Sequence, residues 1–231
     1  MQNRSVGPTR AHLSEVPLLG RCPHREVLLY TTSNNIQTWK VIDDDETKRF
    51  IKQLRNSAPG PDNIHNRMLK NNSKLLLQHI TCLFNAIIKI GYIAKARKKA
   101  HIILILKPNK NKQDPSSFRP ISLLSCIGKL LEKIMKKRLS DFLEERNLLP
   151  KHQAGFRPGK STIYNIIRLE RFAQHQIDQN RKSGAIMFDI KAAFDSVWHD
   201  GFIYKMFNMQ LHDDILKYLI AFLKDRTAIT L

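Results

Sequence analysis

The chain has 231 residues, of which 39 are Lys or Arg and 20 are Asp or Glu, and it carries a formal net charge of +19. This length predicts one large domain or two small ones, and a hydrophobic content of 42% is enough for a packed core, which excludes wholesale disorder. The clean apolar run Ile102–Leu106 is far shorter than the ~18 residues of a membrane span, so we expect no membrane association.

The three cysteines, Cys22, Cys82 and Cys126, are widely spaced and include no CxxC pair. This pattern argues against a disulfide framework or a zinc site. It predicts an intracellular, reducing compartment without distinguishing the nucleus from the cytoplasm. The excess of positive charge predicts a polyanionic partner, most often nucleic acid. Charge alone indicates attraction and not a reaction.

The first third of the chain contains two predicted helices. Residues 1–42 follow neither a helical nor a strand period, and we expect an irregular leader of unknown role. The acids Asp43–Glu46 then open a helix, because negative charge suits a helix N-terminus, and the turn-forming residues 57–62 end it. Apolar residues recur at helical spacing from Ser73 to about Ile88, which predicts an amphipathic helix.

The most basic stretch surrounds a predicted strand. Residues 89–112 contain eight Lys and Arg and no acid. The short β-branched run His101–Leu106 within them predicts a buried strand with basic flanks. The bases immediately before this strand are candidates for nucleic-acid binding: Lys95, Arg97, Lys98 and Lys99.

The remaining chain alternates between helices and short strands. In chain order we expect a helix at about 127–143, a polar loop at 147–161, a helix from 161 or 162 to about 179, a strand at 185–190, a helix at about 213–224 and a β-like end at 227–231. The last segment has no visible strand partner in the sequence. Together these elements predict a mostly helical α+β fold with an incomplete sheet.

Asp189 ends the predicted strand at 185–190 and has two interpretations of about equal weight. A carboxylate held by rigid backbone at a sheet edge is a good ligand for a hard cation such as Mg²⁺. Asp after a strand also commonly caps the next helix. Asp195, six residues later, is expected in or near that helix, and we assign it a structural role.

Two basic residues next to apolar segments, Lys107 and Arg119, are candidates for binding a triphosphate. Arg offers a planar bidentate fork and Lys a point charge. Taken alone, each is better explained as one solvated base among many. Their assignment therefore depends on further information.

The segment Gln153–Thr162 superficially resembles a P-loop. Ala154 replaces its first glycine, Pro158 removes a backbone N–H, and no buried strand precedes it. We therefore reject a nucleotide triphosphatase. A basic loop with several glycines before a helix remains suited to a nucleic-acid phosphate backbone.

Four motifs occur in a recognisable order: Ser57–Asp62 (SAPGPD), Phe118–Leu124 (FRPISLL), Gly155–Thr162 (GFRPGKST) and Phe188–His199 (FDIKAAFDSVWH). In this order they resemble the reverse transcriptases of non-LTR retrotransposons, jockey-like elements in particular. The resemblance covers about residues 43–231 and leaves the leader unexplained.

The resemblance implies the fold of a right-hand polymerase, with residues 43–183 as fingers and residues 184–231 as the start of the palm. It implies an RNA-directed DNA polymerase that transfers a nucleotide from a dNTP to a primer 3′-hydroxyl by a two-metal mechanism. The implied partners are an RNA template, a DNA primer and dNTP. The implied cofactor is Mg²⁺ or Mn²⁺.

The resemblance also assigns roles to residues within the matching motifs. Asp189 resembles the first metal-binding aspartate of the palm, beside the backbone carbonyl of Ile190, and Phe194 resembles the aromatic gate that excludes a 2′-hydroxyl. The remaining assignments are Lys107 and Arg119 for the triphosphate and Arg157 and Lys160 for the template strand.

One departure from the family pattern changes the expectation for activity. The aromatic-Ala-Asp-Asp motif that supplies the other palm carboxylates is absent, and Asp213-Asp214 is better explained as the acidic start of a helix. We therefore expect the first half of a polymerase, cut inside the palm, which a further palm segment or a second polypeptide would complete. The alternative is a catalytically inactive basic RNA- or DNA-binding module. A third interpretation, a ribosome-like basic structural protein, agrees with the positive charge but does not explain the order of the four motifs.

Overall fold

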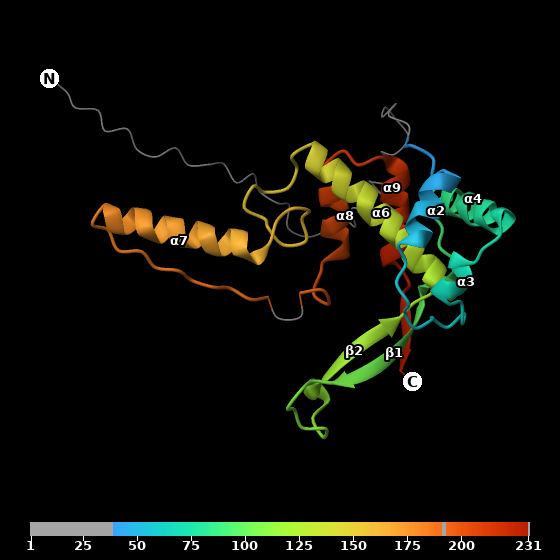
Figure 1. Cartoon of the computed structure of the whole chain (residues 1–231), viewed down its shortest axis with the longest axis horizontal. Helices are drawn as coiled ribbons and strands as arrows, with labels where there is room; N and C mark the ends of the chain where they lie inside the picture. Colours follow the sequence, from blue (N-terminus) through green and yellow to red (C-terminus); the bar gives the residue numbers. More distant parts are fainter. Residues whose placement is uncertain (1–38, 191–192, 231) are drawn as a thin grey trace, which may run out of the picture.

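The structure is a computed structural model that describes residues 39–190 and 193–230. Most of the expected leader, residues 1–38, lies outside the described residues, as do residues 191, 192 and 231. Figure 1 shows one helical body, a β-hairpin that extends from it, and a separate long helix, α7. The chain thus has mixed α/β content with a small three-stranded sheet.

Two of the predicted helices form the first part of the body. Helix α2 (Asp44–Lys52) begins after Asp43, whose carboxylate accepts a hydrogen bond from the Glu46 N–H at 2.7 Å. Helix α4 (Lys74–Ile90) begins after the Ser73 cap and ends at Gly91, whose φ of +66° favours glycine. Both predictions are confirmed. A five-residue helix that the sequence did not indicate, α3 (Asn66–Lys70), lies between them.

The second part of the body contains α6 (Cys126–Glu145), α8 (His199–Asn208) and α9 (Asp213–Leu223). Helices α6 and α9 were predicted, whereas for α8 we expected only that a helix follows Asp189, without its bounds. Helix α4 packs against α9 and α2, and α2 packs against α6. The best-buried apolar side chains at these contacts are Ile42, Phe84, Leu130, Ile134, Ile215 and Leu216. Each helix therefore buries one stripe against its neighbours, as the periodicity predicted.

The end of the expected leader is fixed to this body. Ile42 is 1% exposed. Its backbone N–H donates to the Asn85 side-chain oxygen at 2.8 Å, and its carbonyl accepts from the Asn85 amide nitrogen at 2.8 Å. Residues 39–43 are irregular, as expected, but they are held against α4 by these two hydrogen bonds.

The sheet has the strand order β2-β1-β3. Strand β1 (Lys99–Leu106) pairs antiparallel with β2 (Phe118–Leu123) and parallel with β3 (Thr227–Thr230). The short helices α5 (Lys95–Lys98) and η1 (Pro115–Ser117) precede β1 and β2. Strand β3 therefore has a partner, and the expectation that it has none was wrong, because pairing between residues 128 positions apart leaves no local signal in the sequence.

The prediction of a buried strand at His101–Leu106 was right about the strand and wrong about its burial. Ile103, Leu104 and Ile105 are 39%, 49% and 48% exposed. The hairpin extends away from the helices (Figure 1), so only its base is covered. An apolar run of this length cannot show by itself whether another layer covers the strand.

The loop at residues 57–62 packs against the start of α6. A Cβ atom on Gly60 would lie 2.4 Å from the Leu124 carbonyl carbon and 2.5 Å from the Ser125 nitrogen. Only a glycine allows this approach of two backbones. The loop thereby fixes the junction where β2 ends and α6 begins.

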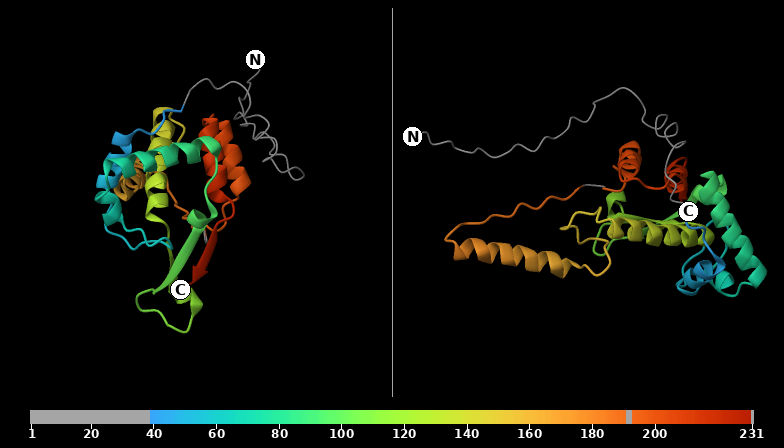
Figure 2. Two further views of the ribbon diagram at one scale, coloured as in Figure 1. Left: turned by 90° about the vertical axis from the view of Figure 1, so that its right-hand side faces the viewer. Right: turned by 90° about the horizontal axis from the view of Figure 1, so that it is seen from above.

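The predicted helix that follows the polar loop is confirmed as α7 (Thr162–Asp178), but α7 buries none of its residues. In Figure 1 and in the right-hand view of Figure 2, α7 lies away from the helical body. The segment after it, predicted as a strand at 185–190, is irregular. Its apolar side chains Ile186, Met187 and Phe188 are 81–89% exposed.

The strand prediction at 185–190 was wrong for a physical reason. A strand needs a neighbour to pair its backbone N–H and C=O groups, and within the described residues no strand lies beside this segment. None of the helices in the same residues combines the length and hydropathy needed to cross a membrane.

Candidate nucleotide and nucleic-acid interface

Lys107 and Arg119 lie on one face of the β1–β2 hairpin. Arg119 is opposite Ile105, and residues opposite each other in an antiparallel pair point to the same face. The Lys107 N–H donates to the Ser117 carbonyl at 2.8 Å, which continues the ladder by one residue on each strand. Because side chains alternate along a strand, Lys107 faces the same way as Ile105 and Arg119. The hairpin thus places two cations diagonally across one rigid surface.

The turn of the hairpin adds an acid that the sequence analysis missed. Hydrogen bonds from the Ser116 hydroxyl and N–H to the Asp114 carboxylate, together with the positive charge of Lys107, lower the pKa of Asp114 below its ordinary value. The Lys107 ammonium itself donates to the Ser116 carbonyl at 2.7 Å. One of its three protons is therefore engaged, and Arg119 is the more exposed of the two cations.

The basic cluster before β1 divides into exposed and covered members. Lys95 and Lys99 are exposed, whereas Lys98 is only 7% exposed. Arg97 is partly buried, and burial lowers the pKa of its guanidinium from the usual value, although the nearby Asp62 opposes that shift. Of the four candidate residues, Lys95 and Lys99 present their charge most openly to a polyanion.

Arg157 is engaged within the protein. Its guanidinium donates to both Glu144 carboxylate oxygens, at 2.7 and 2.5 Å, and to the Pro150 and Gln153 carbonyls, at 2.9 and 3.3 Å. The hydrogen bond from Arg157 lowers the pKa of Glu144, and the same contact raises the pKa of Arg157. The side chain is 12% exposed. Arg157 thus ties residues 147–160 to the end of α6.

Lys160 lies at the start of α7. Its ammonium nitrogen is 4.7 Å from the centre of the Tyr164 ring, and it donates to the Lys151 carbonyl at 3.4 Å. Gly159 before it has a φ of +69°. The charge of Lys160 is thereby held over an exposed aromatic ring.

Asp189, Ile190 and Phe194 lie in the irregular segment between α7 and α8. Ile190 is 71% exposed and Phe194 is 86% exposed. Asp189 is exposed and has no hydrogen bond or ion pair with any described residue. The alternative role of Asp189 as a helix cap is wrong for the described residues, because the next helix begins at His199 and its cap position is Trp198. Asp195 lies in a turn and not in a helix.

These residues do not assemble a metal site in the described part of the chain. No group of three or more His, Cys, Asp and Glu side chains is placed to hold an ion there. The donors at hand are the Asp189 carboxylate and the Ile190 carbonyl. Hard cations take six or more oxygen ligands, so these two donors do not by themselves hold a pair of ions.

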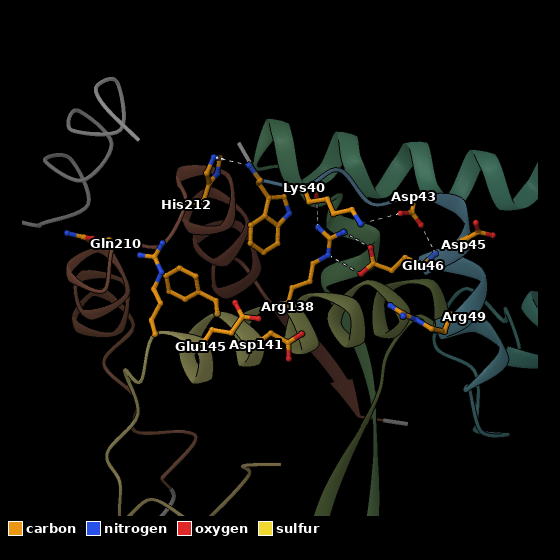
Figure 3. A pocket seen from close by; sticks show the side chains of 13 residues that line it. Lys40, Asp43, Asp45, Glu46, Arg49, Arg138, Asp141, Glu145, Gln210 and His212 are labelled. Carbon is orange, nitrogen blue, oxygen red and sulfur yellow. Dashed lines mark hydrogen bonds and ion pairs between the residues drawn. The ribbon is translucent and has the colours of Figure 1, made fainter. Parts of the chain in front are cut away.

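A cavity of about 760 Å³ lies between α2, α6 and the loop before α9 (Figure 3). Within it Arg138 pairs with Glu46, and the Arg138 guanidinium carbon lies 5.2 Å from the centre of the Trp39 ring. The Trp39 backbone N–H donates to His212 at 3.3 Å. The cavity contains none of the candidate residues. Its contacts join positions up to 173 residues apart, so no sequence signal could have found it.

Comparison with known proteins gives a consistent result. Residues 105–230 match the model of the family described as reverse transcriptase (RNA-dependent DNA polymerase). The chain is 39% identical over 168 residues to a probable RNA-directed DNA polymerase from transposon BS of Drosophila melanogaster, which covers 72% of the chain. It is 38% identical over 162 residues to the RNA-directed DNA polymerase from mobile element jockey of Drosophila funebris, which covers 70% of the chain.

A more distant relative covers more of the chain. The Pol polyprotein from the type-1 retrotransposable element R2 of Popillia japonica is 24% identical over 196 residues, or 82% of the chain and 25% of the polyprotein. The two Drosophila proteins are matched over 18% of their length each. The chain therefore spans less than a fifth of those curated relatives.

Proposed function

Because the chain belongs to the reverse transcriptase (RNA-dependent DNA polymerase) family, we propose that it forms the nucleotide- and template-binding part of a mobile-element RNA-directed DNA polymerase. In this proposal residues 43–183 are the fingers and residues 184–231 begin the palm. The reaction of the whole polymerase is transfer of a nucleotide from a dNTP to a primer 3′-hydroxyl on an RNA template.

The observation that carries this proposal is the pair of cations on one face of the hairpin. A triphosphate is bound by several positive charges, and a two-stranded ladder holds Lys107 and Arg119 on one surface. Arg119 supplies a planar fork for two phosphate oxygens, and Lys107 supplies a point charge. The exposed Phe194 ring is proposed to lie against the sugar of the same nucleotide.

Reverse transcriptases use divalent metal ions, and we propose that the Asp189 carboxylate and the Ile190 carbonyl are two of the ligands. These two donors do not complete a two-ion site, so further ligands from outside the described residues would be needed. Lys95 and Lys99 are proposed to contact the phosphates of RNA or of an RNA–DNA hybrid. Lys160 is proposed to contact the template strand.

Nucleotide binding by the chain tests the role of the hairpin. Arg119→Gln removes charge-assisted hydrogen bonds worth roughly 1.5–3 kcal/mol, so the Kd for a fluorescent dNTP should rise roughly tenfold or more. Lys107→Gln should act in the same direction. Lys110→Gln, an exposed change in the same turn, is the matched control and should have little effect. Equal effects of Arg119→Gln and Lys110→Gln would contradict the proposed grip.

The proposed role of Asp189 is tested in a polymerase that contains this segment within a longer chain. Asp189→Asn keeps the shape of the side chain and removes its charge, so primer extension should be abolished. Asp195→Asn should leave part of the activity, because Asp195 lies in a turn six residues away. Full extension by Asp189→Asn would overturn the assignment of Asp189.

A further inference from the structure

Helix α7 has two chemically different faces. At about 100° of rotation per residue, Ile163, Ile166, Ile167 and Ile177 gather on one side, with Glu170 among them. Tyr164, Arg168, Arg171, Phe172 and His175 gather on the other. Neither face is buried against the rest of the described chain. An amphipathic helix normally pairs an apolar face with a mixed-charge face, so a face built from bases and aromatic rings needs a separate explanation.

The aromatic and basic side chains alternate along this second face. Tyr164, Arg168 and Phe172 follow one another at intervals of four residues, which places them one above the next. Tyr164 is 48% exposed and Phe172 is 54% exposed. We call these three residues, together with Lys160, the α7 ladder. In its order of Lys160, Tyr164, Arg168 and Phe172, cations and rings alternate over three turns.

The loop that Arg157 fixes completes this surface. His152 in the loop and Arg168 and Phe172 on α7 line one groove of about 470 Å³. At the other end of the α7 ladder, the Lys160 ammonium lies over the Tyr164 ring at 4.7 Å. The bidentate contact between Arg157 and Glu144 holds the loop that supplies His152. The rings and charges are thus arranged before any ligand binds.

We propose that the α7 ladder binds single-stranded nucleic acid by stacking unpaired bases on Tyr164 and Phe172 and by contacting phosphates with Lys160 and Arg168. The inference rests on the proposed function, since the strand bound there would be the RNA template away from its duplex. Proteins that bind single strands without sequence preference combine a basic groove with exposed aromatic rings. The α7 ladder has both features.

The charge of this face favours a polyanion, and its exposed rings favour an unpaired strand over a duplex. Glu170, the nearest acid within the helix, is two residues from both Arg168 and Phe172, which places it about 200° around the helix from each. A duplex exposes its phosphates but keeps its bases stacked inside. It could therefore contact Lys160 and Arg168 but could not stack bases on Tyr164 and Phe172. Only an unpaired strand uses both kinds of side chain.

Fluorescence anisotropy of the 231-residue chain with a labelled 12-nucleotide single-stranded RNA tests the proposal. Tyr164→Leu and Phe172→Leu remove a π face and keep an apolar, helix-forming side chain. Stacking is worth ~1–3 kcal/mol per base, so each change should raise the Kd by about 5- to 150-fold. Arg168→Gln should lower the slope of log K against log salt by ~0.7. Circular dichroism checks that the helix content is unchanged.

The matched control is Tyr204→Leu, which alters an equally exposed tyrosine, 52% exposed, on α8. This change should leave the affinity at the wild-type value. Lys95→Gln with Lys99→Gln reports separately on the basic cluster before β1. If that pair weakens binding while Tyr164→Leu and Phe172→Leu do not, the α7 ladder is not a nucleic-acid site and the proposed function stands.

Three other outcomes also overturn the inference. Equal affinity losses for a 12-base-pair RNA duplex would mean that the rings do not stack on bases. Oligo-glutamate that binds as tightly as RNA, with the same response to the substitutions, would point to an acidic protein partner. If the wild-type chain binds no RNA, both the α7 ladder and the proposed template binding are wrong. The proposed dNTP grip would not be affected by that result, because the Arg119 experiment tests it separately.

Discussion

The contact between Arg157 and Glu144 shows how one side chain can organise a loop. Four hydrogen bonds from a single guanidinium join α6 to residues 150 and 153. The family motif that contains Arg157 suggests template binding, and the geometry adds a structural contribution to the same residue. With its fork engaged by a carboxylate, Arg157 has less capacity to bind phosphate than the neighbouring Lys160.

This contact predicts a pH-dependent loop. The pKa of Glu144 is lowered in the folded protein, so its stabilising contribution is present above the ordinary carboxyl pKa of ~4.3 and is lost as the pH falls through the folded-state value. Amide hydrogen exchange of residues 148–160 should therefore accelerate on acidification beyond the intrinsic change. Glu144→Gln should show fast exchange already at neutral pH.

Glu145→Gln is the matched control for this experiment, because Glu145 is the next residue of α6 and lines the large cavity instead of the loop. Exchange in residues 148–160 should remain slow in this variant at neutral pH. Similar exchange in Glu144→Gln and wild type would show that the ion pair does not hold the loop.

At the scale of the elements, α2 and α6 are joined by one well-covered ion pair in addition to their apolar contacts. Arg138 on α6 pairs with Glu46 on α2 (Figure 3), and the two side chains are 12% and 13% exposed. Arg138 also donates to the Lys40 and Val41 carbonyls. The same guanidinium covers the Trp39 ring. Arg138 therefore connects α6 both to α2 and to the residues that immediately precede α2.

Removing one partner should be costly. Arg138→Leu leaves the part-buried Glu46 carboxylate without its partner, and such changes cost roughly 1–3 kcal/mol. Urea denaturation should show a loss of this size. Lys137→Leu is the control on the same helix, since its pair with Asp141 is 61% and 44% exposed and is worth at most ~1 kcal/mol. Combining Arg138→Leu with Glu46→Leu should restore part of the stability, because no unpaired charge remains. Equal losses of stability for Arg138→Leu and Lys137→Leu would contradict the stabilising role of the Arg138–Glu46 pair.

At the scale of the whole molecule, the apolar surface is unevenly distributed. The helices of the body bury one apolar stripe each, whereas the isoleucine face of α7 and residues 186–190 and 194–198 expose their large apolar side chains. Exposed apolar patches beyond a few hundred Å² promote association. The hairpin adds a further uncovered apolar strand.

We therefore expect the chain to self-associate through the isoleucine face. Ile163→Gln with Ile166→Gln should shift sedimentation towards the monomer. It should leave the melting temperature unchanged, because these side chains are 64% and 59% exposed and little burial is lost. The control is Ile134→Gln on α6, a 0% exposed position, which should lower the melting temperature strongly. A lower melting temperature in the α7 variant would mean that the folded protein covers that face.

Much of the local structure could be read from the sequence. The Asp43 and Ser73 caps, the helical periods of α4, α6, α7 and α9, and the ordered motifs all act within a few residues, so their signals are present in the chain itself. The family followed from the same motifs. The roles of Asp189, Phe194 and Lys160 remain predictions from that resemblance.

Other features were decided only by the tertiary structure. These features depend on which residues come close in space. They are the pairing of β3 with β1, the burial of Lys98, the contact of Arg157 with Glu144 and the ion pair across the cavity. The run at 185–190 has the residues of a buried strand and yet stays irregular and exposed. An apolar period states which surface can be buried, but burial and strand pairing also need a second surface. The sequence therefore determined the longer helices, α4, α6, α7 and α9. The packing of segments that are far apart in the chain determined which residues each side chain contacts.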